Sequence, residues 1–138
     1  MKKTLLFLFT IFTISAATGQ GNNLQFNNVL TMSFEAAGST DDTQTLTVPS
    51  GQVLKITSAH ASHATNRNNN DLQILKFKEL SSSSYTNLTS GTENSYSNSS
   101  NNFPIWLKAG IYMFELDNEQ NSGTGTAILT GIYFNIVQ

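Results

Sequence analysis

The chain has 138 residues, with seven Lys or Arg against nine Asp or Glu, and it contains no cysteine. The absence of cysteine excludes disulfides, a thiolate metal site and a cysteine nucleophile. The acidic balance argues against nucleic acid as a partner, because binding to phosphates requires a concentrated basic surface.

Residues 1–19 have the layout of a secretory signal peptide. Two lysines at positions 2 and 3 precede an apolar run over 5–14, and small residues follow. Cleavage after Gly19 or after Ala17 fits these small residues. The run is shorter than the roughly 20 apolar residues that cross a bilayer, so we expect no membrane span.

The expected mature part, residues 20–138, numbers 138 − 19 = 119 residues and suits a single domain. Without the two signal lysines it carries five basic and nine acidic residues, a formal charge of −4. We expect the protein to be secreted or periplasmic.

Apolar and polar residues alternate in the first half of this domain, as in half-buried strands. Strands are predicted at 28–34, 43–48, 53–59 and 72–80. Pro49, Ser50 and Gly51 supply turn chemistry between the second and third of these, which predicts a hairpin. The polar segment 60–71 is predicted to be a loop.

Residues 81–102 are rich in Ser and Asn, with a short edge strand predicted around Tyr85, Leu88 and Tyr96. Strands are then predicted at 103–107 and 111–117, joined by a turn at 108–110 as a second hairpin, and at 126–137. The total is seven or eight short strands without a helical period. It predicts an all-β fold, an antiparallel β-sandwich or jelly roll.

The last predicted strand is apolar on both faces, which predicts burial on both sides. One face carries Ile128, Ile132, Phe134 and Ile136, and the other carries Ala127, Leu129, Tyr133 and Val137. Either the strand lies centrally under a loop, or its outer face meets another subunit.

Three segments carry a resemblance to a known group of proteins. They are Leu-Thr-Val-Pro-Ser-Gly-Gln-Val-Leu-Lys-Ile at 46–56, Phe-Pro-Ile-Trp-Leu-Lys-Ala-Gly at 103–110, and Leu-Thr-Gly-Ile-Tyr-Phe-Asn-Ile-Val at 129–137. With them the chain resembles small exported β-sandwich proteins of Bacteroidetes and the head domains of phage tail fibres. The resemblance implies a surface-display or assembly domain, often trimeric, and transfers no functional residue.

Aromatic residues are the candidate ligand-binding residues, since an aromatic ring packs on the apolar face of a sugar. Trp106 is the first candidate, because its neighbours on the strand face the other way. Tyr85 and Tyr96 lie in the polar segment and are placed to contact a partner. For Trp106 the alternative is packing in the core or at a subunit interface.

Two groups of residues are weak candidates for a metal site. His60 and His63, with Asp71 or Glu79, have a ligand-like spacing, but side chains three apart on a strand face opposite sides. Acidic turns could hold calcium at Asp41 and Asp42, or at Asp117, Asn118, Glu119 and Asn121. The histidines are explained as loop residues, and the acidic residues as turn residues that hydrogen-bond their own backbone. We therefore predict no metal and no cofactor, with calcium as the open alternative.

Nothing in the chain forms a catalytic signature, and no Gly-x-Ser-x-Gly elbow is present. We therefore predict a non-catalytic exported β-sandwich that acts through its surface. It would self-associate as a homo-oligomer, or bind a glycan or cell-surface ligand. The first alternative is a carbohydrate-binding module, and the second is a small metal-dependent enzyme at His60 and His63.

Overall fold

The computed structural model of the protein describes residues 23–38, 40–63, 73–91, 103–118 and 123–137. Eight strands occupy these ranges: β1 (Asn23–Ala37), β2 (Asp42–Val48), β3 (Gln52–His63), β4 (Gln73–Glu79), β5 (Thr86–Gly91), β6 (Ile105–Leu107), β7 (Gly110–Asn118) and β8 (Thr124–Val137). Within the same ranges there is no helix that could cross a membrane.

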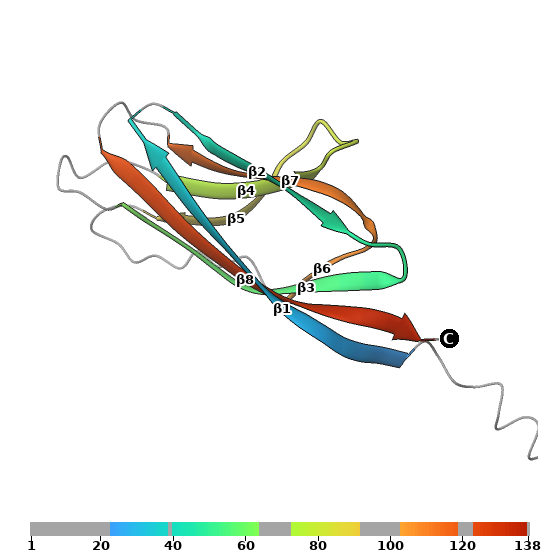
Figure 1. The fold of residues 1–138 in the computed structure, drawn as a ribbon. Helices are drawn as coiled ribbons and strands as arrows, with labels where there is room; N and C mark the ends of the chain where they lie inside the picture. The colour runs from blue at the N-terminus through green and yellow to red at the C-terminus, as the bar shows by residue number, and fades with distance from the viewer. Residues whose placement is uncertain (1–22, 39, 64–72, 92–102, 119–122, 138) are drawn as a thin grey trace, which may run out of the picture.

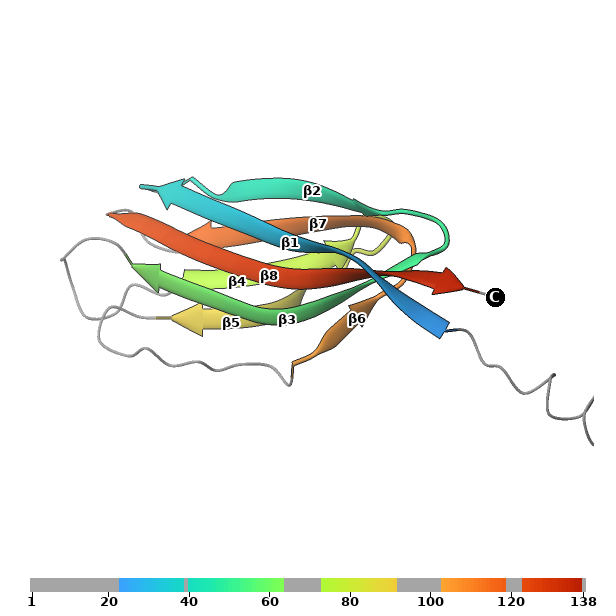
Figure 2. The ribbon, with the colours of Figure 1, turned by 60° about the horizontal axis from the view of Figure 1, so that its bottom comes forward.

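The chain folds back on itself so that the first strand pairs with the last. β1 pairs with β8, β2 with β7, β3 with β6 and β4 with β5, all antiparallel. Pairing of β3 with β8 and of β4 with β7 completes a first sheet, β1-β8-β3-β6, and a second sheet, β2-β7-β4-β5. The two sheets form the two layers in Figures 1 and 2. This arrangement is a jelly roll, and it confirms the predicted all-β sandwich.

The core lies between the two sheets and follows the period of two along each strand. Leu54 and Ile56 of β3 belong to the same core cluster as Phe114 and Leu116 of β7, and all four side chains are fully buried. Phe77 of β4 stacks on Phe114 with 5.6 Å between ring centroids. Each such side chain contributes about 1.5–3 kcal/mol by leaving water, so these inward rows hold the layers together.

The two predicted hairpins are wrong. The strands on either side of residues 49–51, β2 and β3, lie in different sheets, and so do β6 and β7. Each turn carries the chain from one layer to the other. Turn residues mark where a strand ends, but the partner of a strand is decided by packing with distant segments.

The predicted loop over 60–71 begins too early, because β3 continues through His63. Ala59 and Ala61 are buried, while His60 between them is exposed, so the alternation of the strand continues. Alanine is a weak strand former, which hides this extension in the sequence. β1 is also longer than predicted, because it begins at Asn23 rather than Asn28.

Candidate functional site

The outer face of the first sheet carries an apolar patch at one end. The patch comes from β1, β6 and β8, and its members are Leu24, Phe26, Val29, Trp106, Ile132, Phe134 and Ile136. Phe26 lies opposite Phe134 and Val29 opposite Ile132 in the β1–β8 register. These pairs place the apolar side chains next to one another on one face of the sheet.

Large apolar side chains of the patch reach the solvent. The exposed fraction is 63% for Phe26, 64% for Val29 and 48% for Trp106. Ile128 of β8 is 50% exposed, so the predicted burial of both faces of the last strand is wrong within the described chain. The other explanation for its apolar outer face, contact with a second subunit, stays open.

Trp106 lies in the aromatic part of the patch. Its ring centroid is 5.8 Å from that of Phe134, at an interplanar angle of 40°. The ammonium of Lys55 lies 5.4 Å from the Trp106 ring, which is a cation–π distance. Lys55 sits between β6 and β8 in the register, opposite Trp106 and Ile132. The aliphatic part of the Lys55 side chain therefore extends the apolar surface, while its ammonium makes a cation–π contact with the Trp106 indole.

A groove of about 420 Å³ lies at the other end of the first sheet. Its lining combines the apolar residues Phe34, Ala127 and Ile128 with the polar residues Ser33, Glu35, Asp42, His60, Ser62 and Thr126. The hydroxyls of Ser62 and Thr126 bond each other at 3.1 Å. Sequence reasoning missed this groove, because its lining residues are brought together only by the pairing of β1 and β3 with β8.

The edge of β1 is closed beside this groove by side chains of β2. The backbone N–H of Glu35 donates to Asp42 Oδ2 at 2.9 Å, and Gln44 Nε2 donates to the carbonyl of Ser33 at 2.7 Å. Gln44 Nε2 also donates to Asp42 Oδ2 at 3.3 Å. These contacts satisfy edge groups that would otherwise be free to pair with another strand.

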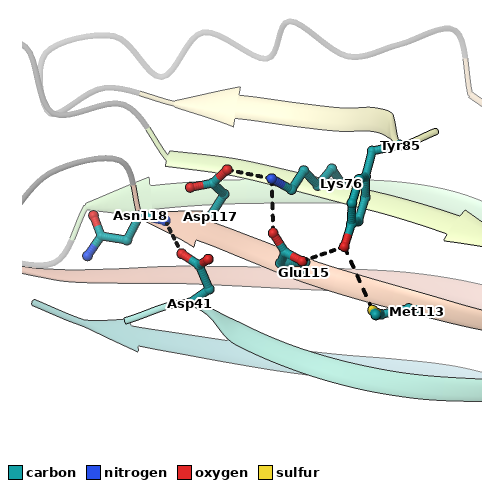
Figure 3. Close-up of polar contacts among 7 residues, drawn as sticks. All are labelled: Asp41, Lys76, Tyr85, Met113, Glu115, Asp117 and Asn118. Carbon is teal, nitrogen blue, oxygen red and sulfur yellow. Dashed lines mark hydrogen bonds and ion pairs between the residues drawn. The ribbon is translucent and has the colours of Figure 1, made fainter. Parts of the chain in front are cut away.

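The second sheet carries a charged cluster on its outer face, drawn in Figure 3. Lys76 Nζ lies 2.9 Å from Glu115 Oε1 and 2.5 Å from Asp117 Oδ2, while the Tyr85 hydroxyl donates to Glu115 Oε2 at 2.6 Å. The ammonium groups of Lys76 and Lys78 lie 4.8 and 4.5 Å from the Tyr85 ring centroid. The members of this cluster satisfy one another, which indicates a stabilising role.

The pKa values in this cluster follow from those contacts. Burial alone would lower the pKa of Lys76, but hydrogen bonds and charges from Asp117 and Glu115 outweigh it and raise this pKa above 10.5. Burial would raise the pKa of Glu115, but hydrogen bonds from Tyr85 and Lys76 lower it below 4.5. The pKa of Tyr85 is raised chiefly because its hydroxyl donates to Glu115.

The structure separates two of the predicted ligand-binding residues. Trp106 lies on the outer face of the first sheet, whereas Tyr85 packs against the outer face of the second. They cannot contact one ligand ring together. Tyr96 lies outside the described residues.

The weak metal candidates are dispersed where they are described. His60 is exposed on β3, His63 ends that strand, and Asp117 is paired with Lys76. Asp41 Oδ1 accepts the backbone N–H of Asn118 at 3.2 Å, while Glu119 falls outside the described residues. No grouping of three His, Asp or Glu side chains suited to a metal ion occurs in the described ranges.

No family model and no curated protein matches the chain. Among solved structures, the core of a Drosophila nucleoplasmin-like protein, NLP, is similar with a TM-score of 0.50 and 13% identity, covering 75% of this chain and 96% of that one. That structure concerns pentamer formation and histone binding. At this identity the likeness shows the fold alone.

Two further structures are similar at lower scores. One is PliG of Salmonella Typhimurium, a periplasmic inhibitor of g-type lysozyme, with a TM-score of 0.43, 18% identity, and coverage of 80% of this chain and 95% of that one. The other is a mitogen derived from Yersinia pseudotuberculosis, with a TM-score of 0.36, 12% identity, and coverage of 80% and 87%. The strand order and pairing by themselves define the class of this chain as a jelly-roll β-sandwich. The resemblance to exported Bacteroidetes proteins and tail-fibre heads stays a prediction.

Proposed function

We propose that the protein is an exported, non-catalytic binding module that self-associates through the apolar patch of its first sheet. The observation that carries this proposal is the exposure of Phe26, Val29 and Trp106 on one face of the sheet. Ile132 of β8 and Lys55 of β3 lie between Val29 on β1 and Trp106 on β6. A second copy of the chain is the occupant we favour, because the patch lies on a sheet face and sheets pack face to face on other sheets.

The size of the patch supports a protein partner. Side chains of this kind at these exposed fractions present on the order of 500 Å² of apolar surface, at the upper end for a monomer. A standard interface buries about 800 Å² on each partner, so the patch would supply much of one side. Burial of that area offsets the cost of association far better than a few scattered contacts would.

The charge distribution also favours a second copy. Lys55 borders the patch, and its ammonium lies 5.4 Å from the Trp106 ring. The patch residues themselves include no Asp or Glu, and Glu35 of the first sheet lies in the groove at the other end. Two patches could therefore meet without facing carboxylates.

The test is the molar mass of the purified protein by light scattering on a size-exclusion column. We expect a multiple of the chain mass for the native protein and a monomer for the Phe26→Ser, Val29→Thr double variant. Both residues are largely exposed, so the variant should fold. Ile111→Ser is the matched control, because Ile111 is 44% exposed on β7 of the other sheet.

A native protein that stays monomeric at high concentration contradicts the proposal, and so does a double variant that keeps the native mass. The same preparation tests export. An intact mass that lacks residues 1–17 or 1–19 supports the signal peptide, whereas a full-length chain in the exported fraction contradicts it.

A further inference from the structure

We propose that the groove of the first sheet, which has both apolar and polar lining residues, is a binding site for a neutral saccharide. The groove is separate from the apolar patch and does not depend on self-association. It lies where β1, β8 and β3 run side by side, with Ile128 in the middle strand and polar side chains on both sides.

The register defines the shape of this site. Ser33 and His60 flank Ile128 in one row across the sheet, and Glu35 and Ser62 flank Thr126 in the next row. Ile128, at 50% exposure, gives the floor an apolar surface. A pyranose ring has an apolar C–H face that packs on such a floor and equatorial hydroxyls that point toward the rim.

The rim matches a hydroxylated ligand. Serine and threonine hydroxyls both donate and accept hydrogen bonds, as sugar hydroxyls do, and the exposed carboxylate of Glu35 accepts two. Asp42 is engaged differently, because its Oδ2 already accepts from the backbone of Glu35 and from Gln44. Within the described part of the chain Glu35 is thus the lining carboxylate whose oxygens are free to accept hydrogen bonds from a ligand.

The charge of the lining decides between ligand classes. Among the described lining residues there is no Lys or Arg, while Glu35 and Asp42 are present, so an anion such as phosphate is disfavoured. A divalent cation needs several oxygen ligands converging within about 2.6 Å, and one unengaged carboxylate does not supply them. The apolar residues Phe34, Ala127 and Ile128 together with the hydroxyls suit a neutral ligand that has both an apolar face and hydroxyl groups.

A band of hydroxyls separates the groove from the apolar patch. Thr130 Oγ1 lies 2.7 Å from Ser58 Oγ and 3.1 Å from Thr57 Oγ1, midway along the sheet. An assembly that buries only the patch end of this sheet face leaves the groove of each copy open. Several copies would then bind one glycan surface with added avidity.

The test uses the full protein and a panel of neutral oligosaccharides (β-glucan, mannan, xylan, galactan and chitin fragments), read by saturation-transfer NMR at millimolar ligand and then by calorimetry. We expect binding of at least one of them. Ile128→Ser and Glu35→Ala should each weaken it about tenfold, the loss of one central contact. Thr45→Ala, at an exposed position of the second sheet, is the control and should bind as the native protein does.

Two outcomes overturn the proposal. One is no saturation transfer from any saccharide of the panel, and the other is binding that the Ile128 and Glu35 variants retain in full. Spermidine is the comparison probe for a cationic ligand, and binding of spermidine without any saccharide would also overturn it. Saccharide binding by a monomeric Phe26→Ser, Val29→Thr variant would show that the groove works without self-association. If the native protein does not self-associate, the proposal of a saccharide site is therefore unaffected.

Discussion

The backbone of Gly125 lies directly against the side-chain amide of Gln73, so that a Cβ at position 125 would overlap Gln73 Oε1. Gln73 is fully buried, and its Nε2 donates to Asn118 Oδ1 at 2.8 Å. Asn118 in turn donates through Nδ2 to the carbonyl of Gly38 at 2.6 Å. This contact joins β4 and β8, and hence the two sheets, at one end of the sandwich.

Gly125→Ala should therefore lower the free energy of unfolding by about 1–3 kcal/mol, the usual cost of an added buried group. Gly110→Ala is the matched control, because a Cβ there meets its nearest atoms at ordinary distances of 3.5–3.6 Å. Urea unfolding of the single variants and of Gln73→Ala, Gly125→Ala measures the coupling. Strictly additive losses would contradict the proposed contact.

The charged cluster of Lys76, Glu115, Asp117 and Tyr85, called the Lys76 cluster below, predicts how stability changes with pH. The folded pKa of Glu115 is below 4.5, so its contribution is present above pH 4.5 and is lost as the pH falls through the folded value. The folded pKa of Lys76 is above 10.5, so its contribution is present below pH 10.5 and is lost at higher pH. We expect this cluster to stabilise most between about pH 5 and 10.

Lys76→Met should reverse the direction in which the free energy of unfolding changes as the pH falls below 7. Without the ammonium, Glu115 and Asp117 lie near each other as two carboxylates, and protonation relieves their repulsion. The variant should lose stability at pH 7 and recover part of it as the pH falls from 6 to 4. Urea midpoints across this range measure the effect, with the exposed Lys108→Met as control. An unchanged acid slope would show that the cluster does not govern it.

The contacts of Asp42 and Gln44 on the β1 edge predict a link between stability and aggregation. Asp42→Ala leaves the backbone N–H of Glu35 without that acceptor and should cost about 1–2 kcal/mol. It should also speed aggregation, because an open edge recruits other strands. Thermal unfolding and turbidity test both effects, and Thr45→Ala, at the exposed position after Gln44 on β2, should change neither.

Trp106 is the one tryptophan of the chain, so its fluorescence reports on the apolar patch. At 48% exposure its emission should lie at long wavelength in a dilute monomer and shift to shorter wavelength as the concentration rises. The Phe26→Ser, Val29→Thr variant should keep the dilute spectrum at every concentration. A native spectrum that does not change while the mass increases would place the interface elsewhere.

The jelly-roll class and the inward rows could be predicted from the chain alone. The strands predicted at 53–59, 72–80 and 111–117 rest on alternation of apolar and polar residues. Their apolar residues Leu54, Ile56, Leu75, Phe77 and Phe114 are all buried. Trp106 was predicted to bind a ligand or to pack in the core or at a subunit interface, and it is half exposed on the outer face, so packing in the core of this chain is wrong. These features depend on local periodicity, because neighbouring side chains of a strand face opposite sides.

Pairing and sites could not be predicted in the same way. Asn27 and Asn135 bond across β1 and β8 although 108 positions separate them, and nothing near either residue specifies the other. The predicted hairpins failed for this reason, and the groove and the Lys76 cluster were missed.

The sequence by itself determined which residues face the core and where the strands turn, since both follow from the period of two and from turn chemistry. The tertiary structure alone decided which strands are neighbours. It thereby decided that Phe26 meets Phe134, that Glu35 and His60 share a groove, and that Trp106 and Tyr85 lie on opposite layers. The physical reason is that such contacts join distant segments through burial of whole sheet faces, a property of the packed chain rather than of any local stretch.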